Sequence, residues 1–592
     1  MNVPASSRVL RLDRDARALE RHERVAIGED RREALVFEGT EELALQLELA
    51  PGDRLRFAYT VAPEAAGAEK RRAALRVTWT PLDGERQVLD EILSGLSGRP
   101  WLERDLPIDD ASTGAGTLTF ATLSPVGARS VIAEPRVVHA DRDEAPRPPN
   151  LLVYLIDTLR ADRLSCYGAP NPTSPRIDRL ADDGFLFERF LAVAPWTRPT
   201  TATLLTGYLP DWHGMGKELP LPASLDTLAE SLATAGYSTW GAVANPQVGL
   251  VELGFDQGFT RFVSLPRVES SPTPSSRRLN DAVLPWIESC SDEPFFLYVH
   301  SLDPHTPYRA VDRPRFARDY DGELAALDLW TKEIEDRAAD FTDEDRTYVT
   351  HRYDDEIARQ DEELGRLLDS LAAADVLDDT IVVVVSDHGE ELGEHGGWNH
   401  GYRMWDELLH VPFVLWLPER LRGAERRAPR RIPEALSQVD FLPGLLELLA
   451  VEDAFPRQGT SWVPLLSGES AALSPLFGVD YQARVGDEIG AFESARTKLV
   501  WRRDGQELLE LELFDLREDP HERRNLARDE PERLERLLAE RDRSLAVAAT
   551  VRERLARAGR SDVLPHDEVA TEEVELSEEE RRELEALGYA GD

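Results

Sequence analysis

Three side chains of metal-binding type stand directly after two apolar runs of this chain. Asp157 follows LLVYLI, and Asp387 and His388 follow VVVVS. Such runs are typical of buried parallel strands, and open α/β sheets bind ligands at the carboxyl ends of their strands. Two carboxylates and an imidazole form a mixed oxygen and nitrogen donor set. We therefore predict one divalent metal ion here, with Mn²⁺ or Zn²⁺ favoured by the histidine and Ca²⁺ or Mg²⁺ as alternatives.

The adjacency of Asp387 and His388 sets a condition on this prediction. Neighbouring residues of a strand point to opposite faces, so the chain must turn for both to reach one ion. Gly389 follows at once and permits such a turn. The alternative interpretation is that Asp387 and His388 only cap a turn.

Thr197 is the candidate nucleophile. It stands two residues before Pro199, a preferred first helical residue, and Gly207 is the expected end of that helix. A hydroxyl needs activation to attack an ester, and a neighbouring metal ion supplies it. The helix N-terminus adds donors for an anion. The alternative is that Thr197 is only the N-cap of the helix.

Histidines are concentrated near four segments of the chain, 151–164, 194–207, 303–308 and 382–401, which contain the candidate residues. The chain has 12 histidines, and seven lie in or beside the segments: His213, His300, His305, His388, His395, His400 and His410. We predict that His305 and His400 bind the oxyanion of the ester and protonate the leaving group. Arg160, Arg198 and His213 are the predicted substrate-binding residues. A further hypothesis is a second ion held by Asp303, His305 and His400.

The pattern of elements predicts an α/β catalytic domain at 149–470. Strands alternate with helices, as in the helices expected at 224–237 (capped by Ser224) and 353–371, which favours a doubly wound, mostly parallel sheet. Residues 471–560 are expected to form a small antiparallel sheet and a helix. The acidic tail, 561–592, is expected to contain one surface helix with a capping box at Ser577 and Glu580.

Residues 1–145 predict a different architecture. Short alternating segments broken by Gly, Pro and Asp are typical of an antiparallel β-sandwich, and RDEAPRPPN (142–150) of a linker. The aromatic residues of this part are interpreted as core rather than as a sugar-binding platform: Phe57, Tyr59, Trp79 and Trp101.

The composition excludes some partners. With a net charge of −42, the chain is expected to repel nucleic acid and anionic membranes. No apolar run reaches the about 20 residues of a membrane span, and no secretory signal is visible at the start. Cys166 and Cys290 give no disulfide framework. We therefore expect a cytoplasmic protein, with secretion after removal of a signal as the alternative; the oligomeric state is left open.

The stretch from about 149 to 545 resembles the sulfatase family within the alkaline phosphatase superfamily. The resemblance implies a doubly wound α/β fold with a smaller C-terminal sheet, and one divalent ion beside a nucleophile that attacks a sulfate or phosphate ester. By motif, Asp157, Asp387 and His388 take the ligand positions, Thr197 the nucleophile position and His305 that of a substrate-binding histidine. The similar segments are NLLVYLIDTLRADRLSCYG, SPRIDRLADDGFLFERFLAVAPWTRPTTATLLTGYLPDWHG, FFLYVHSLDPHTPY, DDTIVVVVSDHGEELGEHG and ELFDLREDPHERRNLA.

The departures from this family bear on the chemistry. Sulfatases carry Cys or Ser in the motif Cys/Ser-x-Pro-x-Arg, which is converted to formylglycine; here Thr197 and Thr201 replace the Cys/Ser and the Arg. Threonine is not expected to undergo that conversion. Thr158 stands where a second acid is frequent, and His400 where a lysine is frequent. A threonine with an Asp/Asp/His set is similar to the phosphodiesterases and phosphoryl transferases of the superfamily.

We therefore expect a metal-dependent hydrolase of sulfate or phosphate esters, with phosphoester or phosphodiester chemistry favoured by the threonine. The substrate is expected to be an anionic small-molecule or glycan ester. The first alternative is a catalytically degenerate protein that binds an anionic ligand. The second is that the N-terminal sandwich binds a glycan and the rest supports it.

Overall fold

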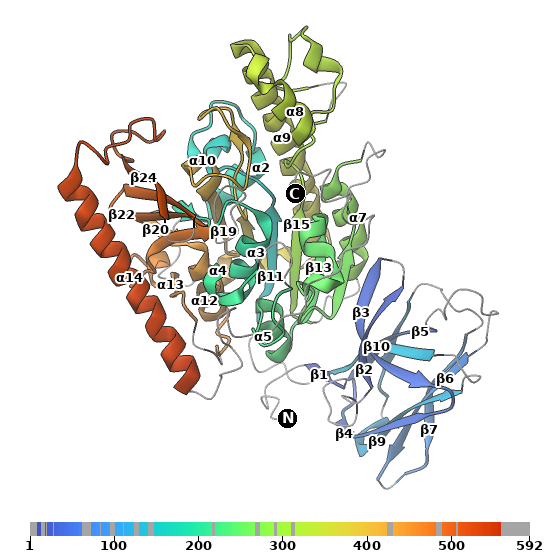
Figure 1. Cartoon of the computed structure of the whole chain (residues 1–592). Helices are drawn as coiled ribbons and strands as arrows, with labels where there is room; N and C mark the ends of the chain where they lie inside the picture. Colours follow the sequence, from blue (N-terminus) through green and yellow to red (C-terminus); the bar gives the residue numbers. More distant parts are fainter. Residues whose placement is uncertain are drawn as a thin grey trace.

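Eight strands of a 14-stranded sheet form the part that carries the candidate site. The computed structural model orders them β20-β12-β19-β16-β11-β15-β13-β14, and all pairs are parallel except those made by β19. This confirms the α/β, mostly parallel sheet (Figure 1). Their bounds are β11 Asn150–Ile156, β12 Phe185–Leu191, β13 Ser238–Val243, β14 Arg261–Ser264, β15 Phe295–Ser301, β16 Thr380–Val385, β19 His410–Trp416 and β20 Arg430–Ser437.

The structure describes residues 9–557 with internal gaps. The gaps are 13–17, 19–20, 28, 62–72, 83, 95–100, 110–111, 124–128, 140–146, 216–219, 267–272, 289–292, 310–313, 423–429, 454, 456, 481–487 and 505–506. The predicted helix of the acidic tail lies outside the described residues, as does most of the predicted linker. In the described part, no helix has both the length and the apolar character needed to cross a lipid bilayer.

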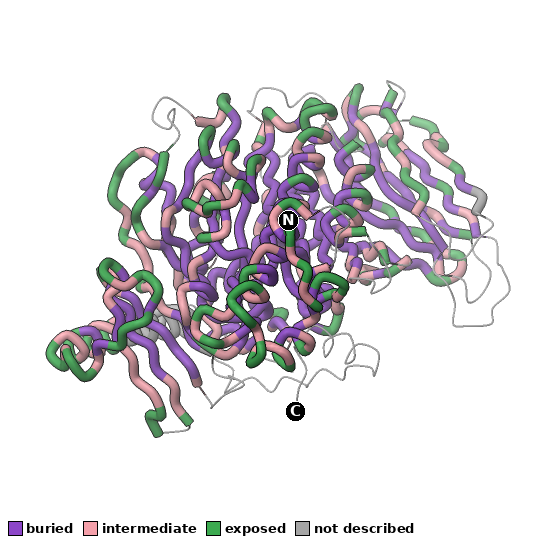
Figure 2. The backbone as a smooth tube through the Cα atoms, turned by 90° about the horizontal axis from the view of Figure 1, so that it is seen from above, coloured by how far each residue is buried: buried purple, intermediate pink, exposed green. Residues whose placement is uncertain are grey.

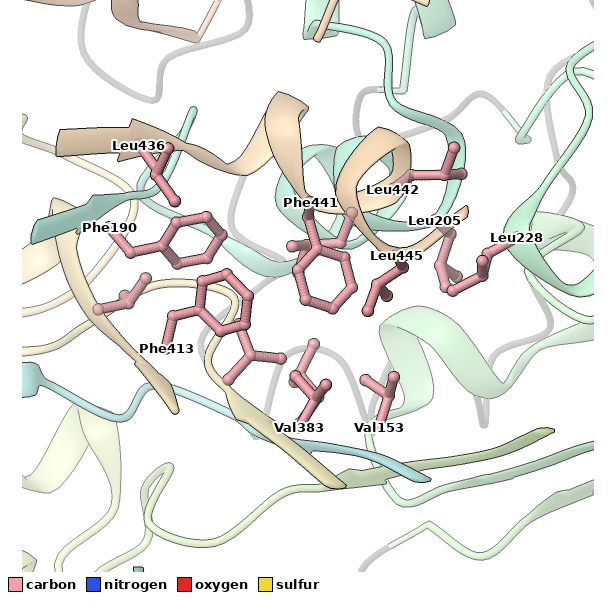
Figure 3. Packing of buried hydrophobic residues seen from close by; sticks show 14 of the residues in the cluster. Val153, Phe190, Leu205, Leu228, Val383, Phe413, Leu436, Phe441, Leu442 and Leu445 are labelled. Atoms are coloured by element: carbon pink, nitrogen blue, oxygen red, sulfur yellow. The ribbon is translucent and has the colours of Figure 1, made fainter. Parts of the chain in front are cut away.

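Helices cover both faces of the sheet, which explains the unbroken apolar runs of its strands. Leu151, Val153 and Leu155 of β11 join one core, and Leu152, Tyr154 and Ile156 join the other. The first core lies under α3 (Thr197–Thr206), α5 (Leu228–Thr234), α12 (Phe441–Leu448) and α13 (Val463–Leu466); Figure 3 shows Leu205, Leu228 and three residues of α12 above Val153 and Val383. The second lies under α2 (Pro175–Asp183), α7 (Ser275–Glu288) and α9 (Asp343–Ala373). Figure 2 shows the resulting buried centre.

The N-terminal strands form the predicted sandwich. One sheet is β4-β9-β6-β7, and the other contains β2, β3, β10, β5 and β8, with β1 paired to β10. Phe57, Tyr59 and Trp79 are buried between them, which confirms that they are core residues. The bounds are β1 Val9–Arg11, β2 His22–Ile27, β3 Asp30–Glu38, β4 Glu42–Leu49, β5 Arg54–Val61, β6 Ala73–Pro81, β7 Gln87–Ser94, β8 Leu102–Pro107, β9 Gly114–Leu123 and β10 Arg129–Val138.

The sandwich and the central sheet are continuous, which no sequence pattern indicates. β3 pairs with β14 in antiparallel fashion, with Arg32 opposite Arg261, so one sheet runs from the sandwich to the candidate site. The expected domain boundaries at 145/149, 470/471 and 560/561 stay predictions.

The C-terminal part is a small antiparallel sheet followed by a helix, as expected. The sheet order is β21-β22-β23-β24, and α14 packs against it through Leu534, Leu537 and Leu538. The bounds are β21 Leu476–Asp480, β22 Glu488–Ser494, β23 Thr497–Asp504, β24 Glu507–Asp515 and α14 Pro531–Arg557.

Two predicted helix starts are wrong. α3 begins at Thr197 itself and its N-cap is Trp196, so Thr197 is not the N-cap; Gly207 ends the helix with φ 68°, as expected. α5 begins at Leu228, not near Ser224, because Thr227 and Glu230 form a reciprocal capping box that satisfies the first free N–H groups. The helix expected at 353–371 is the C-terminal two thirds of α9.

A buried carboxylate ties the sandwich to the central sheet. Glu293 accepts hydrogen bonds from Arg56 (2.7 Å) and Arg136 (2.7 Å) of the sandwich and from Ser238 of β13 (3.0 Å). Burial alone would raise the pKa of Glu293, but the charges and hydrogen bonds of Arg136 and Arg56 outweigh it and lower the pKa to about 2. Glu293 therefore stays ionised and compensates part of the charge of two buried arginines, Arg56 and Arg136.

We predict that Glu293→Gln lowers the free energy of unfolding by about 3 kcal/mol, near the lower end for breaking a buried ion pair, because Arg56 keeps Asp105 as a partner. The folded pKa lies below the ordinary 4.5, so this contribution is complete above about pH 4.5 and is lost as the pH falls toward 2. Urea unfolding between pH 3 and 8 measures both effects.

The matched control is Glu91→Gln, which breaks the exposed pair of Arg76 and Glu91. An exposed pair contributes less than about 1 kcal/mol, so this variant is expected to unfold nearly as the parent does. Equal losses in the two variants would contradict the role of Glu293.

Candidate active site

The register of the parallel strands brings the predicted ligands together. Leu155 of β11 lies beside Val385 of β16 on one side and His300 of β15 on the other, and His300 lies beside Val243 of β13. Two residues beyond this row are Asp157, Asp387 and Asn245. Because strand side chains alternate, these three continue toward the face covered by α3, whose first residue is Thr197. The sheet and α3 therefore bring four polar side chains together at one edge of the sheet: Asp157, Asp387, Asn245 and Thr197.

Asp157, Asp387 and His388 form a candidate metal-binding group. Their ligand atoms lie within 4.8 Å of one another, and all three residues are buried. His388 Nε2 is 3.8 Å from Asp157 Oδ1 and 3.6 Å from Asp387 Oδ2. Those two oxygens have no hydrogen-bond partner. Two buried, unpaired carboxylate oxygens facing an imidazole nitrogen are the arrangement that a divalent cation satisfies, so the residues fit the predicted ion.

The backbone after β16 makes the adjacency of Asp387 and His388 workable. His388 Nδ1 lies 2.8 Å from the carbonyl oxygen of Gly389, which can only accept, so Nδ1 donates and Nε2 keeps its lone pair for the site. At Gly389 an added Cβ would lie 1.9 Å from the carbonyl oxygen of Glu407. Only glycine fits at position 389, and the chain can therefore turn directly after His388.

Two residues that the sequence analysis did not assign to the site hold Asp157. His300 Nε2 donates to Asp157 Oδ2 (3.1 Å), and its Nδ1 accepts from the hydroxyl of Tyr298 (3.0 Å). Asn245 Nδ2 donates to the same oxygen (2.5 Å), while its Oδ1 accepts from the N–H of Gln247 as the N-cap of α6 (Pro246–Gly249). The signal that could have marked Asn245 is its position as a polar residue at the end of the mostly apolar run STWGAVAN (238–245), which contains β13.

The two carboxylates differ in their electrostatics. Burial would raise the pKa of Asp157, but the hydrogen bond of His300 and the charges of nearby histidines lower it. Burial and the neighbouring charge of Asp157 raise the pKa of Asp387. Two like charges buried side by side repel each other, and a bound cation removes that repulsion.

Thr197 is in contact with this group. Its Oγ1 lies 3.3 Å from His388 Nε2 and accepts from Asn245 Nδ2 at 3.3 Å. Because Nε2 carries no proton in this tautomer, the hydroxyl of Thr197 is the donor to it. Thr197 is fully buried at the first position of α3, and the free backbone N–H groups of a helix N-terminus are suited to binding an anion.

His305 and His400 lie beside the metal-binding group. The ring of His400 is 4.5 Å from that of His388 and 5.0 Å from that of His305, measured between centroids. Glu390, which the sequence analysis did not single out, lies 2.8 Å from His400 Nδ1. Burial raises the pKa of Glu390 well above its ordinary value, and its Oε1 accepts from Nδ1–H of His400, so Nε2 is the ring nitrogen that does not contact Glu390.

The predicted substrate-binding residues have other partners. Arg160 pairs with Asp162 and Glu394, both at 2.7 Å, so its charge is already compensated. His213 is buried with Nε2 against Thr203 (3.1 Å) and Nδ1 accepting from the N–H of Met215 (3.1 Å). Burial lowers the pKa of His213 to about 3, so it is neutral and its nitrogens are occupied, which is not what an anion-binding residue needs. Arg198 is buried on α3.

The second-ion hypothesis receives no support. Asp303 Oδ2 accepts from Ser275 at 2.7 Å and from the backbone and hydroxyl of Ser276. In the described part of the chain, Asp157, Asp387 and His388 are the one group of metal-binding side chains that are close enough to share an ion. A single ion is therefore the arrangement that the geometry favours.

The family comparison matches this geometry. Residues 149–451, just over half the chain, match the family model described as "Sulfatase". Residues 393–546 match the model described as "N-sulphoglucosamine sulphohydrolase, C-terminal". All the candidate ligands and Thr197 lie within the first match.

Individual proteins of known name are similar over much of the chain. An ulvan-active sulfatase of Formosa agariphila is 27% identical over 341 residues, which cover 53% of this chain and 64%, less than two thirds, of that protein. An N-acetylglucosamine-6-O-sulfatase of Bacteroides thetaiotaomicron is 22% identical over 65% of this chain and 83% of that protein. The crystal structure of a phosphonate monoester hydrolase of Agrobacterium radiobacter shares the fold, with a TM-score of 0.54, 23% identity, and coverage of 68% and 96%.

The contacts of Asp157 predict how strongly the site holds a metal ion. We expect the purified protein to bind one equivalent of Mn²⁺ or Zn²⁺. His300→Gln is expected to weaken binding about 10- to 100-fold, because supporting partners of ligands contribute that much to metal affinity. Calorimetric titration of the chelated and dialysed protein measures stoichiometry and affinity.

His213→Gln serves as the control, since His213 is also a buried histidine but contacts neither carboxylate. It is expected to keep the parent affinity. A stoichiometry of two ions, or equal affinity in His300→Gln and the parent, would contradict the prediction.

Proposed function

The chain belongs to the sulfatase family, a family of ester hydrolases, and we propose that it hydrolyses phosphate or sulfate esters through a covalent adduct on Thr197. The observation that carries this proposal is the position of the Thr197 hydroxyl. It lies within 3.3 Å of both His388 Nε2 and Asn245 Nδ2, at the first residue of a helix and against a buried carboxylate pair. A lone N-cap or packing threonine has no need of these neighbours.

Asp157, Asp387 and His388 would hold the ion, and the imidazole favours Mn²⁺ or Zn²⁺. When bound, the ion supplies positive charge that lowers the pKa of an adjacent hydroxyl and stabilises negative charge on the ester. Asn245 fixes Thr197 by donating to Oγ1, and the same amide fixes Asp157. The nucleophile and the ligand set are therefore held at a fixed separation by one side chain.

The reaction proceeds in two displacements. The oxygen of Thr197, its proton released to solvent, forms a bond to phosphorus or sulfur, and the bond to the leaving oxygen breaks. That oxygen keeps the electron pair and takes a proton from His400 Nε2. In the second displacement a water molecule gives a proton to His400 and its oxygen forms a bond to phosphorus or sulfur. The bond to the Thr197 oxygen breaks, phosphate or sulfate is released, and the Thr197 oxygen takes back a proton from solvent.

Phosphoester chemistry is favoured over sulfate-ester chemistry by Thr197, which offers a simple hydroxyl. The structural likeness to a phosphonate monoester hydrolase is consistent with a fold that accommodates phosphorus centres, although it bears on the fold alone. The names of the curated relatives refer to sulfated polysaccharides and sugars, and an ester on a small molecule or a glycan is the proposed substrate class. A degenerate binding protein remains the alternative function.

Thr197→Ala is expected to lower kcat at least about 10³-fold on an aryl phosphodiester or phosphate monoester, because the variant lacks the attacking oxygen. The measurement is a panel of aryl phosphodiester, aryl phosphate and aryl sulfate with metal-supplemented protein. Acid-quenched parent protein is expected to carry the added group on Thr197, as detected by mass spectrometry.

Thr206→Ala is the matched control, since Thr206 is a buried threonine at the other end of α3 whose hydroxyl bonds the carbonyl of Ala202. It is expected to keep the parent rate. Full activity of Thr197→Ala would exclude the covalent route, and an inactive parent with bound metal would favour the binding protein.

The contact of Glu390 with His400 predicts a dependence on the leaving group. Glu390→Gln and His400→Gln are expected to slow an alkyl ester about 10²-fold or more and a nitrophenyl ester far less, because a nitrophenolate leaves without a proton. The ratio of kcat/KM for the two esters, compared between parent and variants, is the measurement. Equal losses on both esters would show that Glu390 and His400 only maintain the structure.

A further inference from the structure

A second pocket lies next to the candidate active site. Its volume is about 320 Å³, and its wall includes Glu335, Glu391, Gly397, Trp398, Tyr402 and Arg403. Five of these residues come from the hairpin of β17 (Glu391–Leu392) and β18 (Trp398–Asn399) and the segment after it. Glu335 belongs to α8 (Thr331–Arg337), which Figure 1 shows beside α9, far from the N-terminal sandwich.

The hairpin separates this pocket from the catalytic residues. Glu390 directly precedes β17 and contacts His400, which directly follows β18. Glu391 is the next residue after Glu390, and successive residues of extended chain point to opposite sides. The hairpin therefore presents Glu390 to the active site and Glu391 to the pocket.

Glu391 has no partner that explains its burial. It is only 2% exposed, and its Oε1 has no hydrogen bond. Its carboxyl group packs against Gly397, where an added Cβ would lie 2.7 Å from Oε1. A buried carboxylate oxygen without a hydrogen bond is costly, so a hydrogen-bond donor from outside is the expected complement of Glu391 Oε1.

The surroundings of Glu391 add negative charge. Burial raises its pKa to about 7; the charges of His395 and Arg403 oppose the rise, and the carboxylates of Glu407 and Glu394 add to it. The pocket wall itself holds two carboxylates, Glu335 and Glu391, against the guanidinium of Arg403. Arg403 is itself 3.9 Å from Glu510. A cation is therefore favoured over an anion in this pocket.

We propose that this pocket binds a protonated amine, through an ion pair with Glu391 and contact with the aromatic side chains of Trp398 and Tyr402. An organic cation fits better than a metal ion, because Glu391, His395 and Glu407 are not within mutual ligand distance, and the volume exceeds that of an ion. Aromatic rings beside a carboxylate stabilise ammonium groups. This proposal rests on the proposed function only in that the amine can belong to the ester substrate.

The test is calorimetric binding of glucamine, a protonated amino polyol, and of sorbitol, its neutral counterpart of equal size. The parent protein is expected to bind glucamine 10- to 100-fold more tightly than sorbitol, the range for about 1.5–3 kcal/mol in a charged hydrogen bond. Glu391→Gln is expected to abolish this preference. Glu335→Gln, which changes an exposed carboxylate of the same wall, is expected to keep it.

Two further variants separate the competing explanations. Thr197→Ala is expected to bind glucamine as the parent does, so failure of the proposed catalysis leaves this test intact. Absence of glucamine binding by the parent, with binding gained in Arg403→Gln, would overturn the proposal by showing that Arg403 is the partner of Glu391. Equal affinities for glucamine and sorbitol in the parent would also overturn it.

A kinetic experiment distinguishes an amine that is part of the ester substrate from a separate amine ligand. Aryl phosphodiesters with aminoalkyl and alkyl groups of equal length are compared in the parent and in Glu391→Gln. A higher kcat/KM for the aminoalkyl ester that disappears in the variant supports an amine on the substrate. Equal values, together with glucamine binding, support the same site occupied by a separate amine.

Discussion

Two carboxylates buried side by side are the constraint on which the rest of the site depends. Asp157 and Asp387 end adjacent parallel strands in matching register, so their repulsion follows from the sheet itself. His300 and Asn245 bond one oxygen of Asp157, and the N–H groups of Thr158 and His388 bond one oxygen of Asp387. Each carboxylate is left with one unpaired oxygen, and these two face His388 Nε2. The supporting contacts therefore leave Asp157 Oδ1 and Asp387 Oδ2 directed at the space beside His388 Nε2.

The positions of the protons on His388 and His300 are set by groups that can only accept hydrogen bonds. The carbonyl of Gly389 fixes the tautomer of His388, and the carboxylate of Asp157 fixes that of His300. The amide of Asn245 uses one N–H for Asp157 and one for Thr197. Because each donor has a defined acceptor, the lone pairs of His388 and the hydroxyl of Thr197 point into the same space, which prearranges the groups for charge that develops during ester cleavage.

The sequence predicted the parts of the site that depend on strand ends, and missed those that depend on register and local capping. The apolar runs before Asp157 and Asp387 can be recognised from the sequence alone, and so can the threonine before Pro199. The roles of His300 and Asn245 require knowing that β15 and β13 lie beside β11. Ser224 looked like a cap, but Thr227 offered a closer glutamate partner. Residue type alone does not reveal that Arg160 pairs with Asp162 and Glu394 or that His213 contacts Thr203 and Met215, and their substrate-binding roles stay predictions.

The hairpin of β17 and β18 shows how strand alternation divides chemistry between two sides. Glu390 and Glu391 are adjacent glutamates, yet Glu390 contacts His400 of the site, whereas Glu391 lines a separate pocket and its Oε1 has no hydrogen bond. Both glutamates belong to the same short hairpin segment, which also contains Trp398 and ends directly before His400. The pocket and the residue proposed to protonate the leaving group therefore share one hairpin, because Trp398 lines the pocket and His400 is the first residue after β18.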